Sequence, residues 1–201
     1  FIVSDANTRL FMLESGEVDL IKDLSLYDID YLNSLGDENI VTEVEPSARS
    51  YQVTLHNQRP PLDNKEVRQA FNYAIDKDGM NQSIFDGLFE LERDLNTVSK
   101  YVGGYHPMEP YTYNPEKAKE MLEANGLVDT NGDGYREWEG KEKEFIFVTR
   151  SGQRPGDIEI AEQVQAMLGE VGLNVRIDVM DSATYFTFLN QPMETAPYYD
   201  L

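Results

Sequence analysis

The sequence of 201 residues contains no cysteine, which excludes disulfide bonds, thiolate metal sites and cysteine nucleophiles. No run of about 18 apolar residues occurs, so we expect no membrane-spanning helix. No secretion signal is recognisable. The chain begins at Phe1 without a methionine, and its last residues resemble the start of a strand. We therefore expect it to be a fragment of a larger protein.

Positive charge is also scarce, with 17 basic residues against 37 acidic ones and a net charge of −20. Such a balance repels phosphate backbones and anionic lipids, and we expect no nucleic-acid or membrane-surface partner. The acidic residues are spread along the chain, as on a well-hydrated surface. A hydrophobic content of 40% and 11% aromatic residues argue against disorder. The length allows one large domain or two small ones.

Motifs of catalysis are missing as well. The sequence has no GxSxG elbow, no HExxH zinc motif and no phosphate-binding P-loop. A hydrolase would need a nucleophile beside a base, or paired carboxylates with separated pKa values, and scattered acids do not define such a pair. We predict that the protein is not an enzyme and holds no cofactor.

Residues 60–76 form the stretch with the clearest pattern. Two prolines keep the incoming chain extended, and Asp63 can then cap a helix with Glu66 as its capping-box partner. Apolar residues recur at helical spacing and predict one buried stripe: Val67, Ala70, Phe71, Ala74 and Ile75. Asp76 ends this helix and can begin the next.

The remaining pattern predicts an α/β (mixed α+β) fold, with a mixed sheet flanked by helices. Helices are expected after Asp5, after Asn114-Pro115 and from Ser182, and also over residues 26–35 and 155–172. Strands are expected over residues 1–3, 18–21, 40–44, 50–55, 145–150, 173–180 and 198–201. Residues 145–180 constitute a βαβ unit, which predicts two parallel neighbouring strands. The long stretch 87–113 carries several tyrosines, which pack over the domain surface or line a groove.

Residues 129–140 raise the question of a metal. Asp129, Asn131, Asp133 and Gly134 match the early positions of a calcium-binding EF-hand loop. The position that needs a bidentate glutamate is Gly140, and a strand rather than a helix follows. The same residue types favour tight turns. We therefore predict a hairpin turn and no metal; the alternative is a calcium-binding extracellular surface or adhesion module.

Four segments carry a resemblance to a known family: residues 13–19 (LESGEVD), 60–76 (PPLDNKEVRQAFNYAID), 114–126 (NPEKAKEMLEANG) and 161–177 (AEQVQAMLGEVGLNVRI). They are similar to motifs of the family 5 extracellular solute-binding proteins, the peptide-, oligopeptide- and nickel-type receptors of ABC importers. The turn at residues 129–134 also resembles one that many members share. These segments keep the family's order and cover nearly the whole chain.

The resemblance implies a periplasmic-binding-protein type II-like lobe, with residues 1–201 as a single, partial C-terminal lobe of a two-lobed receptor. It implies a substrate-binding component that captures peptides or related small solutes between two lobes and delivers them to a membrane permease. The expected setting is extracytoplasmic, in the periplasm or lipid-anchored at the outer face of the cell membrane, and the expected state is monomeric.

Three residues are weak candidates for contact with the solute: Tyr51, His56 and Asn57. They lie on or just after the predicted strand at residues 50–55, which the resemblance places near the cleft. His56 is one of only two histidines, and a histidine at a strand end can equally be a surface or hydrogen-bonded residue. The residue that anchors a peptide's amino group in relatives is expected to lie outside this chain.

Overall fold

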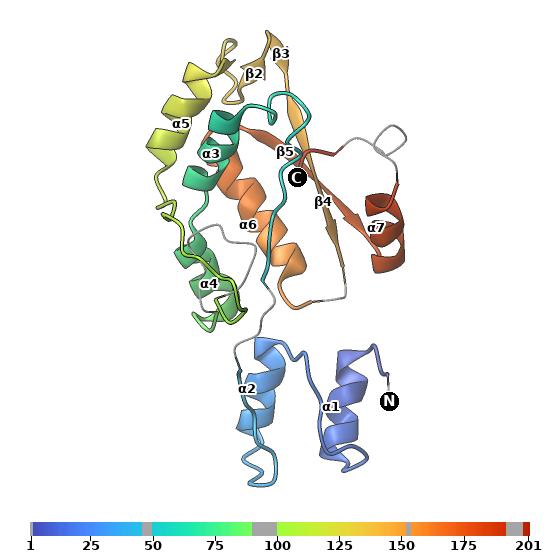
Figure 1. The fold of residues 1–201 in the computed structure, drawn as a ribbon. Helices are drawn as coiled ribbons and strands as arrows, with labels where there is room; N and C mark the ends of the chain where they lie inside the picture. The colour runs from blue at the N-terminus through green and yellow to red at the C-terminus, as the bar shows by residue number, and fades with distance from the viewer. Residues whose placement is uncertain (1, 46–49, 90–99, 152–153, 192–198) are drawn as a thin grey trace. The chain divides into compact units, whose positions relative to one another are not determined.

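The structure, a computed structural model, describes residues 2–45, 50–89, 100–151, 154–191 and 199–201. The chain forms two compact units, Phe1–Pro46 (unit 1) and Ser47–Leu201 (unit 2). Figure 1 shows the helices and strands of both units. The assignment of residues 1–201 to one C-terminal lobe stays a prediction.

Unit 1 contains two helices, α1 (Ala6–Glu14) and α2 (Leu26–Ser34). The Asp5 carboxylate accepts a hydrogen bond from Thr8 N at 2.8 Å, which confirms Asp5 as the cap of α1. Ser25 and Asp28 form a reciprocal capping box at the start of α2. Among the described residues of unit 1, the buried hydrophobic side chains are Leu10 and Leu32. Unit 1 therefore has a very small apolar core.

The strands predicted at residues 1–3, 18–21 and 40–44 were wrong, because none of the described residues in these runs forms a strand. Val18 N donates to Met12 O at 3.2 Å and so closes the end of α1. Ile40 N donates to Asp37 O at 3.0 Å in a local turn. An alternating pattern yields a strand only where a partner accepts its N–H groups, and local carbonyls accept them here.

In unit 2 the stretch with the strongest pattern forms α3 (Lys65–Ala74), followed by α4 (Lys77–Phe85). Four of the five residues of the predicted stripe, Val67, Ala70, Phe71 and Ala74, are buried on α3, whereas Ile75 is half-buried just after its end. Asp76 caps α4 as expected. The predicted cap of α3 was wrong by one residue. Asn64 accepts from Glu66 N at 2.9 Å, while Asp63 N donates to Arg59 O in the preceding turn. That turn continues through Asp63 because Leu62 is fully buried.

The centre of unit 2 is a parallel strand pair, β4 (Glu144–Arg150) and β5 (Asn174–Met180), joined by the crossover helix α6 (Asp157–Glu170). Its register aligns Phe145 with Val175 and Arg150 with Met180. The predicted βαβ unit is confirmed. Helix α6 packs on both strands, and α3 packs against α6 and against α5 (Pro115–Ala124).

Apolar side chains from all these elements form one core. Its fully buried members include Leu62 before α3, Val67 on α3, Leu122 on α5, Phe145 on β4 and Leu168 on α6. Burial of each large apolar side chain stabilises the fold by about 1.5–3 kcal/mol, so the core accounts for most of the stability of unit 2. Within the described ranges, no helix is long and apolar enough to cross a membrane.

The turn predicted at residues 129–134 is present in an antiparallel sheet. Strand β1 (Leu127–Val128) pairs with β2 (Glu137–Trp138), and β2 pairs with β3 (Lys141–Glu142). Asp129 Oδ1 accepts from Gly132 N at 2.6 Å, and Asp129 Oδ2 accepts from Gly134 N at 3.0 Å. The aspartate therefore helps to organise the turn without a metal, as the turn chemistry predicts.

Residues 50–55 are irregular rather than a strand, which corrects the prediction for them. The chain reaches backbone pairing only at His56, whose N–H donates to Asp200 O at 2.9 Å. Asp200 N in turn donates to Ile146 O on β4 at 2.9 Å. Residues 199–201 thus lie between β4 and His56 without being assigned as a strand, and Tyr198 lies outside the described residues.

Two further predictions concern α7 and the tyrosine-rich stretch. Helix α7 (Ser182–Leu189) begins at the predicted residue, with Asp181 as its cap. Residues 90–99 of the tyrosine-rich stretch lie outside the described residues. Tyr111 packs against α3, with its ring 4.9 Å from that of Tyr73 and its hydroxyl accepting from Gln69 Nε2 at 2.8 Å. Tyr111 therefore has the packing role that was one of the two expectations.

Candidate ligand-binding surface

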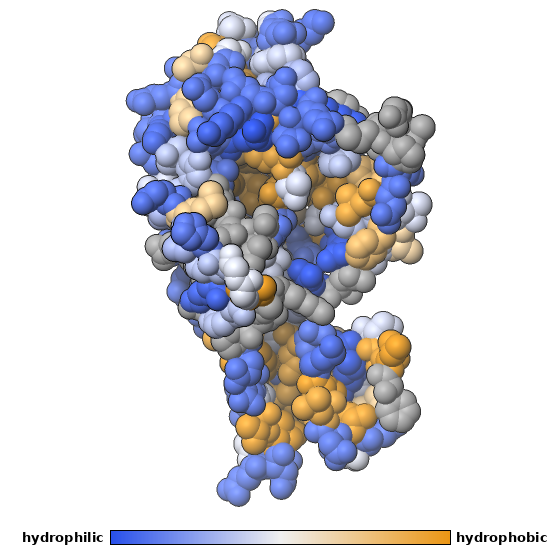
Figure 2. Space-filling model, in the orientation of Figure 1, coloured by the Kyte–Doolittle hydropathy of each residue, from blue (hydrophilic) through white to orange (hydrophobic). Residues whose placement is uncertain are grey.

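The carboxyl ends of the two parallel strands lie together, because Arg150 at the end of β4 is paired with Met180 at the end of β5. Helix α6 begins after β4, and α7 begins after β5. In α/β folds, ligands bind outside the carboxyl ends of parallel strands. Figure 2 shows apolar residues at the surface of unit 2 around α7 and in the hollow beside it. Val179, Phe186 and Leu189 are exposed there.

Arg150 is held at this edge by aromatic rings and one acid. Its guanidinium carbon lies 5.4 Å from the ring centre of Tyr185 and 5.3 Å from that of Phe186. Its Nε is 3.7 Å from Asp157 Oδ2 in the first turn of α6. Burial raises the pKa of Asp157, and the charges of Arg150 and Arg154 oppose that rise. The site thus combines a cation, two rings and a carboxylate of weakened acidity.

Arg154 lies just before α6, and its guanidinium carbon is 5.5 Å from the ring centre of Tyr51. The Tyr51 hydroxyl donates to Pro155 O at 2.7 Å, which ties the extended segment to the start of α6. The Tyr51 ring also contacts Phe85 and Phe89, at 5.8 and 5.6 Å between ring centres. The Tyr51 ring therefore packs against the guanidinium of Arg154 and belongs to an aromatic cluster.

His56 belongs to a second cluster in unit 2. Its ring lies edge-on to that of Tyr199, with 5.2 Å between centres. Tyr199 also contacts Phe188 of α7 at 5.1 Å, and the guanidinium of Arg59 lies 5.7 Å from its ring centre. His56 Nδ1 is buried and has no hydrogen-bond partner among the described residues. This cluster joins α7 to the segment that contains His56.

The structure therefore does not bring the three predicted site residues together. Tyr51 and His56 lie at opposite ends of an extended segment and contact different side chains. Asn57 is exposed in the turn that follows. Their contact with a solute stays a prediction, because this unliganded chain does not test it.

Sequence reasoning missed the arginines that accompany these residues, Arg59, Arg150 and Arg154. A signal for two of them was available. Arg150 ends a predicted strand and Arg154 precedes a predicted helix, which is the position where α/β folds bind ligands. In a chain of net charge −20, cations at that position are conspicuous. An arginine presents a planar set of donors that suits a carboxylate.

The acidic turn is a second place to consider. One carboxylate oxygen from each of Asp129, Asp133 and Glu137 lies within 4.8 Å of the others, in a chain without a bound ion. Several of these oxygens already accept hydrogen bonds from the turn: Glu137 Oε2 accepts from both Thr130 N and Oγ1, each at 2.7 Å. Hydrogen bonds from the turn, first that of Gly132 N, lower the pKa of Asp129. The arrangement accounts for a stable hairpin.

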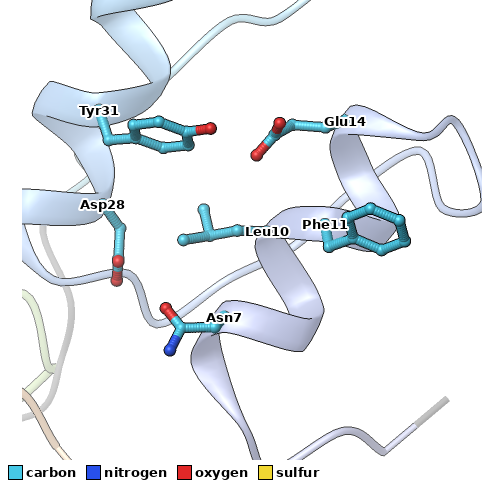
Figure 3. A pocket seen from close by; sticks show the side chains of 6 residues that line it. All are labelled: Asn7, Leu10, Phe11, Glu14, Asp28 and Tyr31. Carbon is cyan, nitrogen blue, oxygen red and sulfur yellow. The ribbon is translucent and has the colours of Figure 1, made fainter.

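Unit 1 has a pocket of about 330 Å³ between α1 and α2. Figure 3 shows the Tyr31 hydroxyl directed at the Glu14 carboxylate across this pocket. Hydrogen bonding to Glu14 raises the pKa of Tyr31. Asp28, which also lines the pocket, accepts from Ser25 N in the capping box. The polar groups of the pocket thus serve the helices themselves.

The fold places the chain in a structural class: it is a mixed α/β lobe of the periplasmic-binding-protein type II kind. The oligopeptide-binding protein AppA from Bacillus subtilis, solved in complex with a nonapeptide, superposes with a TM-score of 0.72. That likeness covers 95% of this chain and 37% of AppA, at 25% identity. The peptide complex of DppA from Helicobacter pylori gives a TM-score of 0.69 at 27% identity, over 92% of this chain and 32% of DppA.

Residues 1–198 match the bacterial extracellular solute-binding proteins, family 5, and the chain belongs to that family. Among curated proteins, AppA of Bacillus subtilis (strain 168) is 27% identical over 196 residues, which are 95% of this chain and 35% of AppA. The probable di/tripeptide-binding protein 5 of Pseudomonas aeruginosa (strain UCBPP-PA14) is 29% identical over 190 residues, 90% of this chain and 31% of that relative. The chain therefore spans about a third of the length of these relatives. These relatives support solute binding, and not the calcium-dependent adhesion alternative.

Proposed function

We propose that this chain is part of the substrate-binding component of an ABC importer, which captures peptides or related small solutes between two lobes and delivers them to a permease. Ligand binding then selects a closed state by contacting both lobes. On this proposal the chain supplies one lobe surface, in an extracytoplasmic protein that acts as a monomer, is held in the periplasm or by a lipid anchor, and has no enzymatic activity.

The observation that carries this proposal is the pair of arginines at the carboxyl end of the parallel strands. Arg150 and Arg154 both lie over aromatic rings, and the carboxylate of Asp157, three residues after Arg154, is 3.7 Å from Arg150 Nε. A ring face supports a guanidinium without engaging its N–H donors in strong hydrogen bonds. The arrangement suits an anionic group of the solute, such as the carboxyl terminus of a peptide.

Family membership supports the solute class. The relatives named above are described as binding oligopeptides or di- and tripeptides, and another relative is described as a glutathione-binding protein of Pectobacterium atrosepticum. These solutes share a peptide backbone and free carboxylates. We therefore infer a short peptide with a free carboxyl terminus as the solute of the parent protein.

The experiment is a thermal-shift and calorimetric titration of the parent protein with peptides in free-acid and amidated forms. We expect the free acid to bind more tightly and Arg154→Met to weaken it by about ten- to hundredfold, as for loss of a hydrogen bond to a charged group. Arg176→Met, at an exposed ion pair with Glu144, is the matched control and leaves affinity unchanged. Equal affinity for the two peptide forms would refute recognition of the carboxylate.

The isolated chain gives a second test. Because the other lobe supplies about half of the contacts in a two-lobed receptor, we expect little stabilisation of residues 1–201 alone by the same peptides. Micromolar binding of a peptide to the isolated chain would contradict closure between two lobes as the basis of affinity.

A further inference from the structure

Asp200 is fully buried and forms an ion pair. Lys143 Nζ lies 3.0 Å from both carboxylate oxygens of Asp200, and the Lys143 side chain is itself largely buried. The ammonium also lies 4.6 Å from the ring centre of Phe145, a fully buried core residue. A buried pair of this kind stabilises a fold less than apolar packing does, so its presence calls for another explanation.

The position of the pair in the strand ladder provides one. Ile146 O accepts from Asp200 N and Leu201 N, and Val148 N donates to Leu201 O, as expected beside a parallel strand. Ile146 N, however, donates to the side-chain oxygen Oδ2 of Asp200 at 2.9 Å. A carboxylate thus takes the place of a backbone carbonyl at the point where the ladder begins.

This substitution leaves the carbonyl of Tyr199 outside the ladder. Tyr199 O instead accepts from Arg59 Nη1 at 3.2 Å. The same residue places its ring against His56 and Phe188. The hydrogen bond from Ile146 N to the Asp200 carboxylate therefore goes together with the placement of Tyr199 against His56 and Arg59.

We propose that the Lys143–Asp200 ion pair is a positioning device, which holds Tyr199 out of the β4 ladder and against His56 and Arg59, and that this cluster forms one wall of the solute-binding site. Lys143 orients the carboxylate of Asp200, whose Oδ2 accepts the hydrogen bond from Ile146 N. The link to solute binding rests on the proposed function, whereas the placement of Tyr199 does not.

The first test uses the imidazole signals of the chain in solution. The sequence has only two histidines, His56 and His106, so their carbon–proton NMR signals are separable. The Tyr199 ring lies edge-on to His56, and its movement shifts the His56 signals. We expect Asp200→Asn and Lys143→Met each to shift the signals of His56 and to leave those of His106 in place.

Two controls separate positioning from mere stability. Glu144→Gln removes an exposed ion pair from the same strand, and Leu122→Ala destabilises the core at a fully buried position on α5. Both should leave the His56 signals of the folded state in place. Unshifted His56 signals in folded Asp200→Asn, or a His56 shift of equal size in Leu122→Ala, would overturn the proposal. If Asp200→Asn does not fold, Lys143→Met gives the same decision.

The second test measures peptide affinity in the parent protein. Residues coupled through one network show interaction energies that correspond to about two- to hundredfold changes in affinity, and we expect Lys143→Met to fall in this range. An unchanged affinity, with wild-type protein that does bind, would overturn the link to the binding wall while the proposed function stands. If the parent protein binds no peptide, the proposed function is refuted. The His56 signals would still test whether the ion pair positions Tyr199.

Discussion

Arg136 and Arg150 are both largely buried in unit 2, yet their surroundings differ in kind. Arg136 Nε donates to Val171 O at 2.7 Å, its Nη1 donates to Leu127 O at 2.8 Å, and its Nη2 is 3.2 Å from Glu123 Oε1. Arg150 lies beside the rings of Tyr185 and Phe186, with one carboxylate at 3.7 Å. The first arginine is engaged by the ends of α5 and α6, and the second lies at an edge where a ligand can approach.

The difference shows that burial alone does not distinguish an arginine that stabilises the fold from one that can bind a ligand. A buried cation stabilises a fold when its N–H donors meet the carbonyls that helix ends leave unsatisfied. A buried cation that rests on ring faces keeps donors for another molecule. Arg136 therefore belongs to the fold, whereas Arg150 and Arg154 are the residues that we propose for the binding surface. Four predictions test this distinction, in order of expected effect on stability.

The largest effect is expected from Arg136→Met. The change leaves the carbonyls of Leu127 and Val171 without a donor, and it should lower the free energy of unfolding by about 3 kcal/mol. Urea unfolding followed by the fluorescence of Trp138, the single tryptophan, measures it, because Trp138 lies two residues away. Arg176→Met on the exposed face of β5 is the control. A loss no larger than the control's would show that Arg136 is dispensable.

A smaller loss is expected from Gly172→Ala. Gly172 has a φ of +83°, and an added Cβ would lie 3.1 Å from Arg136 Cγ and 3.2 Å from Gly134 O. The left-handed backbone conformation alone should lower the free energy of unfolding by about 1–2 kcal/mol. Gly169→Ala, inside α6 with open space around it, should instead stabilise by about 0.5–1 kcal/mol. If both substitutions changed the free energy of unfolding in the same direction, this explanation would be contradicted.

The ionisation of Asp157 is expected to change the free energy of unfolding by less than either of the two substitutions above. Because burial raises the pKa of Asp157 above 3.8, the folded state keeps its proton where the unfolded chain has lost it. The contribution of Asp157 to stability therefore falls as pH rises from 3.8 through its folded-state pKa. Asp157→Asn lacks this titration, so its stability relative to wild type should increase over the same window. Urea unfolding at several pH values measures this; a relative decrease would reverse the sign of the inference.

The smallest effect on stability is expected from Arg154→Met. Its guanidinium rests on the Tyr51 ring, and its removal should change the free energy of unfolding by no more than about 0.5 kcal/mol. The same change should weaken peptide binding by the parent protein. A loss of stability comparable to that of Arg136→Met would place Arg154 with the structural arginines and end the comparison.

Much of the fold was predictable from the sequence because long periodic stretches determine their own structure. The apolar spacing of α3, the proline and glycine that bound α5, and the two apolar strands around α6 each indicated the element that the structure contains. Short alternating runs behaved differently. In the runs 18–21 and 40–44 no strand forms, and the N–H groups of Val18 and Ile40 donate to local carbonyls instead.

The candidate site was less predictable, because it depends on which segments meet. Tyr51, His56 and Asn57 were predicted as candidates for contact with the solute, and the structure places Tyr51 and His56 in separate clusters. Arg154 and Tyr51 are far apart in sequence, and only the fold brings the guanidinium over the ring. The role of Asp200 in the ladder likewise depends on its pairing with β4. Spacing along the chain carries none of this information.

The environment of Arg136 has one more consequence. Its guanidinium joins the chain at Glu123, Leu127 and Val171, so that three segments are held together by one side chain. A guanidinium, unlike a pair of thiols, has no redox chemistry. This connection within unit 2 therefore does not depend on the redox state of the surroundings.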